Sequence, residues 1–96
     1  IRGTESKQPV LEFGHYYKGI AFLKTNNTKE AILNLQWVQK NSTDKNLQLK
    51  AQWYLALAYL KSNNSVEAIN LLKKIADKSA YHRYKKTAQN LLNDLE

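Results

Sequence analysis

The chain contains no cysteine and no methionine, and it has only three glycines and one proline among 96 residues. Without cysteine there is no disulfide framework, no zinc ribbon and no thiol nucleophile. With so few turn-forming residues, an all-β sandwich or barrel, which needs many tight turns, is disfavoured. Because no methionine is present to initiate translation, we expect the sequence to be a piece of a longer or processed protein.

Acidic side chains are also scarce, since eight Asp and Glu oppose fifteen Lys and Arg, for a formal net charge of +7. This charge permits an anionic partner. However, only Arg2 and Arg83 carry the planar guanidinium that specific phosphate and base contacts favour. Ten asparagines accompany the lysines, a pairing that also arises from nucleotide composition alone. We therefore do not expect specific nucleic-acid binding.

Side chains for catalysis or metal binding are sparse as well. The only histidines, His15 and His82, are far apart in sequence, and the eight carboxylates are scattered. No Gly-rich phosphate loop is present. We therefore predict no catalytic residue, no metal site, no cofactor and no enzymatic activity. We expect His15 to be a partly buried structural group, and His82, which lies among lysines and Arg83, to be a solvated surface histidine.

The strongest positive feature is an internal repeat. A shift of 37 residues places residues 14–40 over residues 51–77 with ten identities in 27 pairs, where chance would give about one or two. The identical pairs are Tyr17/Tyr54, Ala21/Ala58, Leu23/Leu60, Lys24/Lys61, Asn26/Asn63, Asn27/Asn64, Glu30/Glu67, Ala31/Ala68, Ile32/Ile69 and Leu35/Leu72. This degree of matching indicates a duplicated structural unit.

Each unit is predicted to form two helices joined by a tight turn. In the second unit, apolar residues recur at helical spacing on two faces of the first helix, so that helix must be covered on both sides. Asn64 and Glu67 resemble a capping box, and we expect the Asn64 side chain to accept an amide of the next helix, as Asn27 would in the first unit. Asp44, in the loop 41–46 between the units, is predicted to cap the following helix.

The two ends of the chain complete this plan. Residues 1–7 are predicted to be an irregular lead-in, after which Pro9 occupies the first turn of the opening helix. A last helix is predicted to open at Ser79 or Ala80 and to carry one apolar stripe, which is typical of a capping helix with a solvated outer face. The stripe comprises Tyr81, Tyr84, Ala88, Leu91, Leu92 and Leu95.

The repeated residues resemble the tetratricopeptide repeat, whose pattern is W-x2-L-G-x2-Y in the first helix and A-x3-F in the second. The matching positions are His15, Lys18, Gly19, Phe22, Ala31 and Leu35 in the first unit, and Gln52, Leu55, Ala56, Tyr59, Ala68 and Leu72 in the second. The resemblance implies antiparallel helix hairpins, in which small residues mark close helix crossings and Phe22 and Tyr59 fill the space between helices. Three features depart from the pattern. The tryptophan position holds His15 and Gln52, the closing proline is missing from both units, and the period is 37 rather than 34.

The segment 51–61 is also similar to the C-terminal repeat domains of bacterial proteins that have a short cytoplasmic region and one membrane span. This similarity implies a periplasm-facing domain, with a cytoplasmic location as the alternative. The sequence itself has no apolar run of the ~18 residues that span a bilayer and no signal peptide. Membrane contact is therefore expected only through an anchor upstream of this sequence.

In the tetratricopeptide fold the first helices line a concave groove, and the alignment places eight residues on this inner face. They are Tyr16, Ile20, Leu23, Lys24, Trp53, Leu57, Leu60 and Lys61. Apolar anchors with a lysine at one end suit a peptide whose carboxylate meets the lysine. The alternative is that so short an array closes on itself and buries these residues against its own ends.

A second candidate surface is basic. It comprises Lys73, Lys74, Lys78, Arg83, Lys85 and Lys86, opposed only by Asp77. Such a cluster suits an acidic protein or a nucleic acid, and the alternative interpretation is a solvated basic face.

Together these patterns predict one all-α domain over residues 8–96, an antiparallel helix-hairpin array with about five helices. Its predicted parts are two tetratricopeptide-like repeats, 8–41 and 42–78, and a capping helix over 79–96. The predicted function is a protein–protein interaction scaffold or adaptor that binds a peptide or partner protein through the apolar groove. The alternatives are a basic module that binds nucleic acid or another polyanion non-specifically, and a structural oligomerisation domain such as a homodimer.

Overall fold

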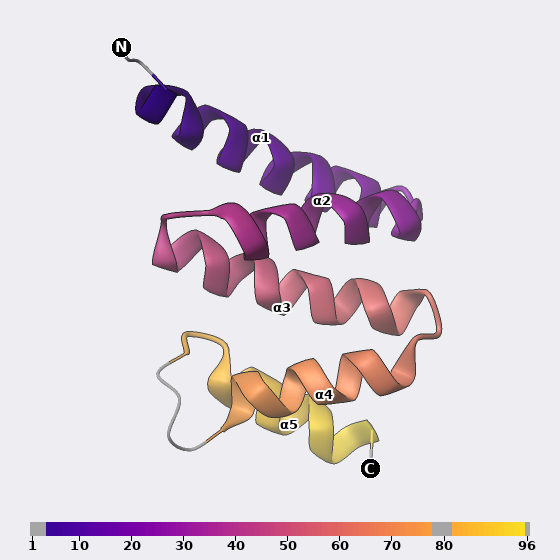
Figure 1. The fold of residues 1–96 in the computed structure, drawn as a ribbon. Coiled ribbons are helices and arrows are strands. Elements are labelled where there is room, and N and C mark those ends of the chain that lie inside the picture. Colours follow the sequence, from indigo (N-terminus) through magenta and orange to yellow (C-terminus); the bar gives the residue numbers. More distant parts are fainter. Residues whose placement is uncertain (1–3, 78–81, 96) are drawn as a thin grey trace.

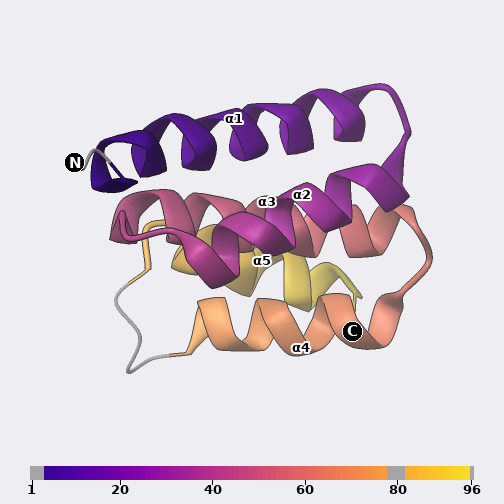
Figure 2. The same cartoon turned by 45° about the horizontal axis from the view of Figure 1, so that its top comes forward.

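The computed structural model describes residues 4–77 and 82–95, and it confirms the predicted all-α class. Its five helices are α1 (Thr4–Lys24), α2 (Thr28–Asn41), α3 (Lys45–Lys61), α4 (Ser65–Ala76) and α5 (Lys85–Leu95) (Figure 1). Each helix packs against its neighbour in the chain, and α1 also contacts α3. Such nearest-neighbour packing is characteristic of a helical repeat array. α1 lies at one edge of this array in both views (Figure 2).

The two hairpin turns share one hydrogen-bond pattern, which shows the duplication in the backbone. Asn26 and Asn63 both adopt a left-handed conformation with φ of 66°. The next amide donates to a carbonyl five residues earlier, 2.8 Å from Asn27 to Phe22 and 2.8 Å from Asn64 to Tyr59. This closure is a Schellman motif, in which asparagine replaces the usual glycine.

The predicted caps are correct at one position and wrong at two. Asp44 has an extended backbone with ψ of 110°, and its Oδ1 accepts from the Leu47 amide at 3.2 Å. Asn27 and Asn64, with ψ of 66° and 67°, make no side-chain cap. Their amide groups instead donate backwards into the turn, to Thr25 Oγ1 and to the Ser62 hydroxyl. Only the extended backbone aims a side-chain oxygen at the amides of the following helix.

Two predicted element boundaries also differ from the structure. α1 begins at Thr4, so residues 4–7 are helical rather than an irregular lead-in, and Pro9 is the sixth helical residue rather than part of the first turn. α5 begins at Lys85 rather than at Ser79 or Ala80. Residues 78–81, which include Tyr81 and Lys78, lie outside the described residues.

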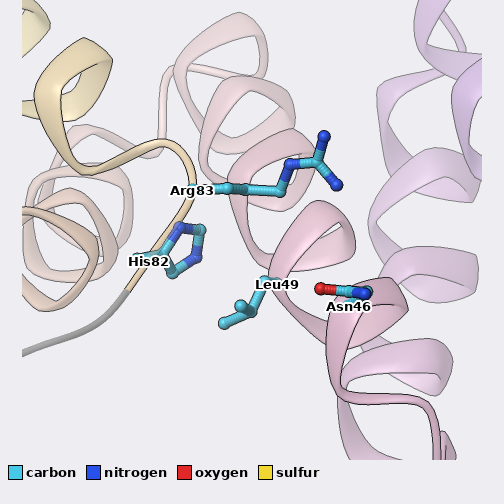
Figure 3. A pocket seen from close by; sticks show the side chains of 4 residues that line it. All are labelled: Asn46, Leu49, His82 and Arg83. Carbon is cyan, nitrogen blue, oxygen red and sulfur yellow. The ribbon is translucent and has the colours of Figure 1, made fainter.

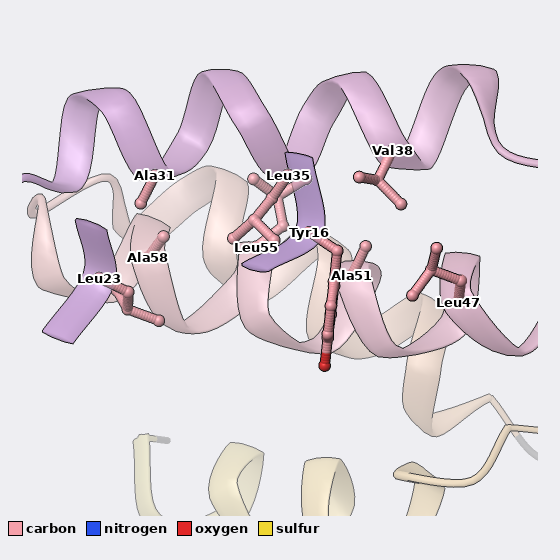
Figure 4. Packing of buried hydrophobic residues seen from close by; sticks show 9 residues of the cluster. All are labelled: Tyr16, Leu23, Ala31, Leu35, Val38, Leu47, Ala51, Leu55 and Ala58. Carbon is pink, nitrogen blue, oxygen red and sulfur yellow. The ribbon is translucent and has the colours of Figure 1, made fainter. Parts of the chain in front are cut away.

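Two hydrophobic clusters share α3, which is covered on both sides as its pattern predicts. Ala51 and Leu55 pack with residues of α1 and α2 (Figure 4), whereas Trp53 and Ala56 pack with residues of α4 and α5. The small residues at the repeat positions mark the close helix crossings as predicted. A Cβ built on Gly19 would lie 2.7 Å from two Leu35 side-chain atoms, so α1 and α2 approach closely only because this residue is glycine.

α5 corresponds to the first helix of a third repeat. Its residues Ala88 and Leu92 lie 37 positions after Ala51 and Leu55, and all four are buried. The opposite side of α5 exposes polar residues, among them Asn90, Asn93 and Asp94. This polar outer side agrees with the predicted capping role.

A buried carboxylate ties α1 to the loop between the repeats, and the sequence patterns did not reveal it. Glu12 is 2% exposed, and its Oε1 accepts a hydrogen bond from the Ser42 hydroxyl at 2.7 Å. The Thr43 amide and hydroxyl both donate to Oε2 at 3.3 Å. These donors replace the water that a buried carboxylate loses, so Glu12 fixes the entry into α3.

Candidate interaction surfaces

The predicted inner face is largely filled by the chain itself. Tyr16, Leu23 and Trp53 are at most 9% exposed. Ile20, Leu57 and Leu60 are half-buried, and only Lys24 and Lys61 are exposed. The structure therefore agrees with the alternative to an open groove, in which the short array buries the apolar residues of its inner face.

Four aromatic rings show what covers the inner face. Tyr84, just before α5, stacks on Trp53 with ring centroids 5.2 Å apart and planes 9° apart. Tyr54 meets Tyr84 edge-on at 6.5 Å and Tyr16 edge-on at 6.2 Å. Burial, followed by the neighbouring tyrosines, raises the pKa of Tyr16 to about 12. The rings thus form a continuous neutral contact from α1 through α3 to the start of α5.

The two lysines of the inner face have different surroundings. Lys61 Nζ donates to the Leu23 carbonyl at 3.4 Å and so joins the end of α3 to the end of α1. Lys24, its repeat equivalent, is exposed at the end of α1. Lys61 therefore serves the contact between the two repeats.

The described residues of the predicted basic surface lie on α4 and around the start of α5. Lys73, Lys74, Arg83 and Lys86 are exposed, Lys85 is half-buried and Lys78 lies outside the described residues. Lys74 lines a hollow of about 220 Å³ together with Tyr59 and Glu67, between α3 and α4. Arg83 lines a different hollow of about 310 Å³ beside the start of α3. The two hollows share no lining residue.

His82 is not the solvated surface histidine that its sequence neighbours suggested. It is half-buried, its Nδ1 accepts from the Tyr84 amide at 3.1 Å, and its Nε2 lies 3.0 Å from Gln52 Oε1. Because Nδ1 accepts, the proton is on Nε2, which donates to the Gln52 oxygen. Burial, and then Lys45 and Arg83, lower the pKa of His82. The neutral ring is the one that holds Tyr84 on Trp53.

His15 is the partly buried structural group that was predicted. Its Nδ1 lies 2.8 Å from Asn34 Oδ1, and its ring stacks on Trp37 with centroids 4.2 Å apart. These contacts fix α1 against α2.

The outer face of α1 is a surface that the sequence analysis missed. Leu11, Phe13 and Tyr17 are 44%, 40% and 63% exposed, and the rings of Phe13 and Tyr17 stack at 6.2 Å. Gly14 and Ala21, also exposed, align with Ala51 and Ala58, which are fully buried in α3. The repeat alignment could have revealed this surface. It pairs residues of α3 that another helix covers with residues of α1, and no described helix precedes α1 to cover them.

Comparisons with known proteins give no relative: no family model, no curated protein and no solved structure matches the chain. Among the described residues, no helix has the length and apolar character that crossing a membrane requires. Within the same residues, histidines and carboxylates form no group of three or more suited to a metal ion.

Proposed function

We propose that the chain is a tetratricopeptide-like interaction module that binds an acidic, helical protein partner through α1. The surface involved, which we call the α1 docking face, comprises Leu11, Gly14, Tyr17, Lys18 and Ala21. One observation carries the proposal: the equivalent face of α3 is covered within the chain, whereas this face is exposed. An exposed aliphatic and aromatic surface of this kind is typical of a binding site.

The packing of α3 supports a helix as the partner element. Ala51 and Ala58 are 0% exposed because α2 packs against them with Leu35 and Val38. Small residues let two helices approach closely. Gly14 would likewise let a partner helix approach α1 closely, since a Cβ built there has no atom within 4 Å.

Charge favours an acidic partner over a second copy of the chain. Lys18 replaces the buried Leu55 of the second unit, and it is exposed. The only acid among the described side chains of α1, Glu12, is buried, so two copies of this face would bring cations together. Like charges across an interface oppose association, and the net charge of +7 adds to this repulsion.

The test places p-benzoylphenylalanine at residue 17 in cells and irradiates it, with the same amino acid at the 70% exposed Val66 of α4 as a control. We expect a discrete acidic protein to be cross-linked from residue 17 and not from residue 66. With both proteins purified, Tyr17→Ala should weaken binding by about tenfold or more, because a central aromatic anchor contributes about 2 kcal/mol. Lys18→Glu should weaken binding further at low salt, whereas Val66→Ala should have no effect.

Circular dichroism of each variant checks that the helices are intact. The proposal is contradicted if the purified partner binds Tyr17→Ala as tightly as the unchanged chain. It is also contradicted if residue 17 cross-links only to a second copy of the chain.

A further inference from the structure

The hollow beside the start of α3 is built from two different parts of the chain. It measures about 310 Å³ and is lined by Asn46 and Leu49 of α3 and by His82 and Arg83 from the segment that leads into α5. Figure 3 shows Leu49 between the His82 ring and the Asn46 amide, while the Arg83 guanidinium reaches over the same stretch of α3. The hollow therefore combines an apolar floor with polar groups at its rim.

The donors at this rim are available to a ligand. Both ring nitrogens of His82 are occupied by Gln52 and the Tyr84 amide, so the imidazole contributes only a flat wall. The Arg83 guanidinium carbon lies 5.5 Å from the Tyr84 ring centroid. Within the residues that the structure describes, no side chain accepts a hydrogen bond from Arg83 or from the Asn46 amide. Such free donors are the groups that recognise an acceptor-rich ligand.

The electrostatic surroundings favour an anion. Arg83 lines the hollow, and burial, followed by the charges of Lys45 and Arg83, lowers the pKa of His82. Asp44, which immediately precedes α3, accepts from the Leu47 amide through Oδ1 as the helix cap. An anion in the hollow would thus meet the positive charge of Arg83, which lines it, while Lys45 lies outside the lining at the start of α3.

We propose that this hollow binds a monocarboxylate whose charged group is attached to a small apolar chain. The Arg83 guanidinium would donate a pair of parallel hydrogen bonds to the carboxylate, with a further bond from the Asn46 amide. Leu49 and the His82 ring would cover the apolar chain. One guanidinium and an apolar floor suit a singly charged carboxylate better than a phosphate, which needs more donors. The site lies apart from the α1 docking face and does not depend on it.

The test is a titration followed by amide ¹H–¹⁵N chemical shifts at constant ionic strength, with 4-methylpentanoate as the probe. We expect saturable shifts at residues 46–49 and 82–84, and none from the neutral 4-methylpentanamide. Arg83→Gln should weaken binding by about tenfold or more, as expected for loss of a hydrogen bond to a charged group. Arg83→Lys should restore only part of it, because lysine lacks the planar fork.

The matched control is Lys73→Gln, which removes one positive charge from an exposed residue of α4 and should leave binding unchanged. Leu49→Ala should remove the preference for 4-methylpentanoate over acetate. Adding N-acetylleucine distinguishes the source, because stronger binding than 4-methylpentanoate indicates a peptide end and weaker binding a free acid. The proposal is overturned if the neutral amide or inorganic phosphate shifts the same residues as strongly, or if Lys73→Gln weakens binding as much as Arg83→Gln.

Discussion

The two histidines show that distant neighbours decide what a side chain does. His15 contacts α2 through Asn34 and Trp37, which agrees with its place in the repeat. His82 has basic sequence neighbours, which suggested a solvated residue. Its role instead comes from Gln52, 30 positions away, and from the backbone of Tyr84. A pattern of local charges carries no information about such a long-range pair, so this part of the site could not be predicted.

The hydrogen bonds of His82 predict a pH-dependent stability. Because the pKa of His82 is lowered in the folded chain, the unfolded chain binds more protons below its usual value of 6.5. Above pH 6.5 His82 is neutral in both the folded and the unfolded chain, so the free energy of unfolding has its full value there. It should fall as the pH drops from there toward the lowered pKa, by at most about 1.4 kcal/mol per pH unit. Denaturant unfolding at a series of pH values measures this slope.

His82→Gln provides the comparison, since it removes the titrating ring. Its stability should change less between pH 7.5 and 5.5 than that of the unchanged chain. An equal slope in both proteins would show that other groups cause the pH dependence.

At the scale of helices, several local features were predicted from the sequence, although the side-chain caps at Asn27 and Asn64 were not among the correct ones. The turns at Asn26 and Asn63, the small residues at helix crossings and the cap at Asp44 all follow from short sequence patterns. The start of α5 at Lys85 does not, and the residue just before it, Tyr84, stacks on Trp53, which lies 31 positions earlier in the chain. The buried Glu12 was missed for the same reason, since its donors come from the loop 30 residues later.

Trp53 joins α3 to the start of α5, so its removal should loosen that end of the array. Trp53→Ala is expected to lower the free energy of unfolding by about 3–5 kcal/mol, because a buried aromatic side chain is lost and a cavity remains. Tyr17→Ala, which removes a 63% exposed ring, is the matched control and should cost well under 1 kcal/mol. Thermal and denaturant unfolding followed by circular dichroism compare the two. A Trp53→Ala variant as stable as the control would mean that the inner face is open.

At the scale of the whole molecule, the array has two unlike ends. Among the described residues, α5 exposes mostly polar side chains together with Leu95, which is 43% exposed, whereas α1 exposes Leu11, Phe13 and Tyr17. The sequence analysis placed the binding surface on the inner face, because it considered the groove of a long array and not the edges of a short one. In so short a chain, the edges make up much of the surface, and the inner face is covered by the next helix.

Hydroxyl-radical footprinting of the free chain tests this account most directly, because it measures side-chain exposure without any partner. The account predicts that Tyr17 and Phe13, at 63% and 40% exposure, are oxidised rapidly, whereas Trp53 and Tyr16, at 8% and 9%, are protected despite the high intrinsic reactivity of tryptophan. Denaturing the chain should abolish the difference. Oxidation of Trp53 in the folded chain as fast as that of Tyr17 would contradict a closed inner face and an exposed α1 docking face.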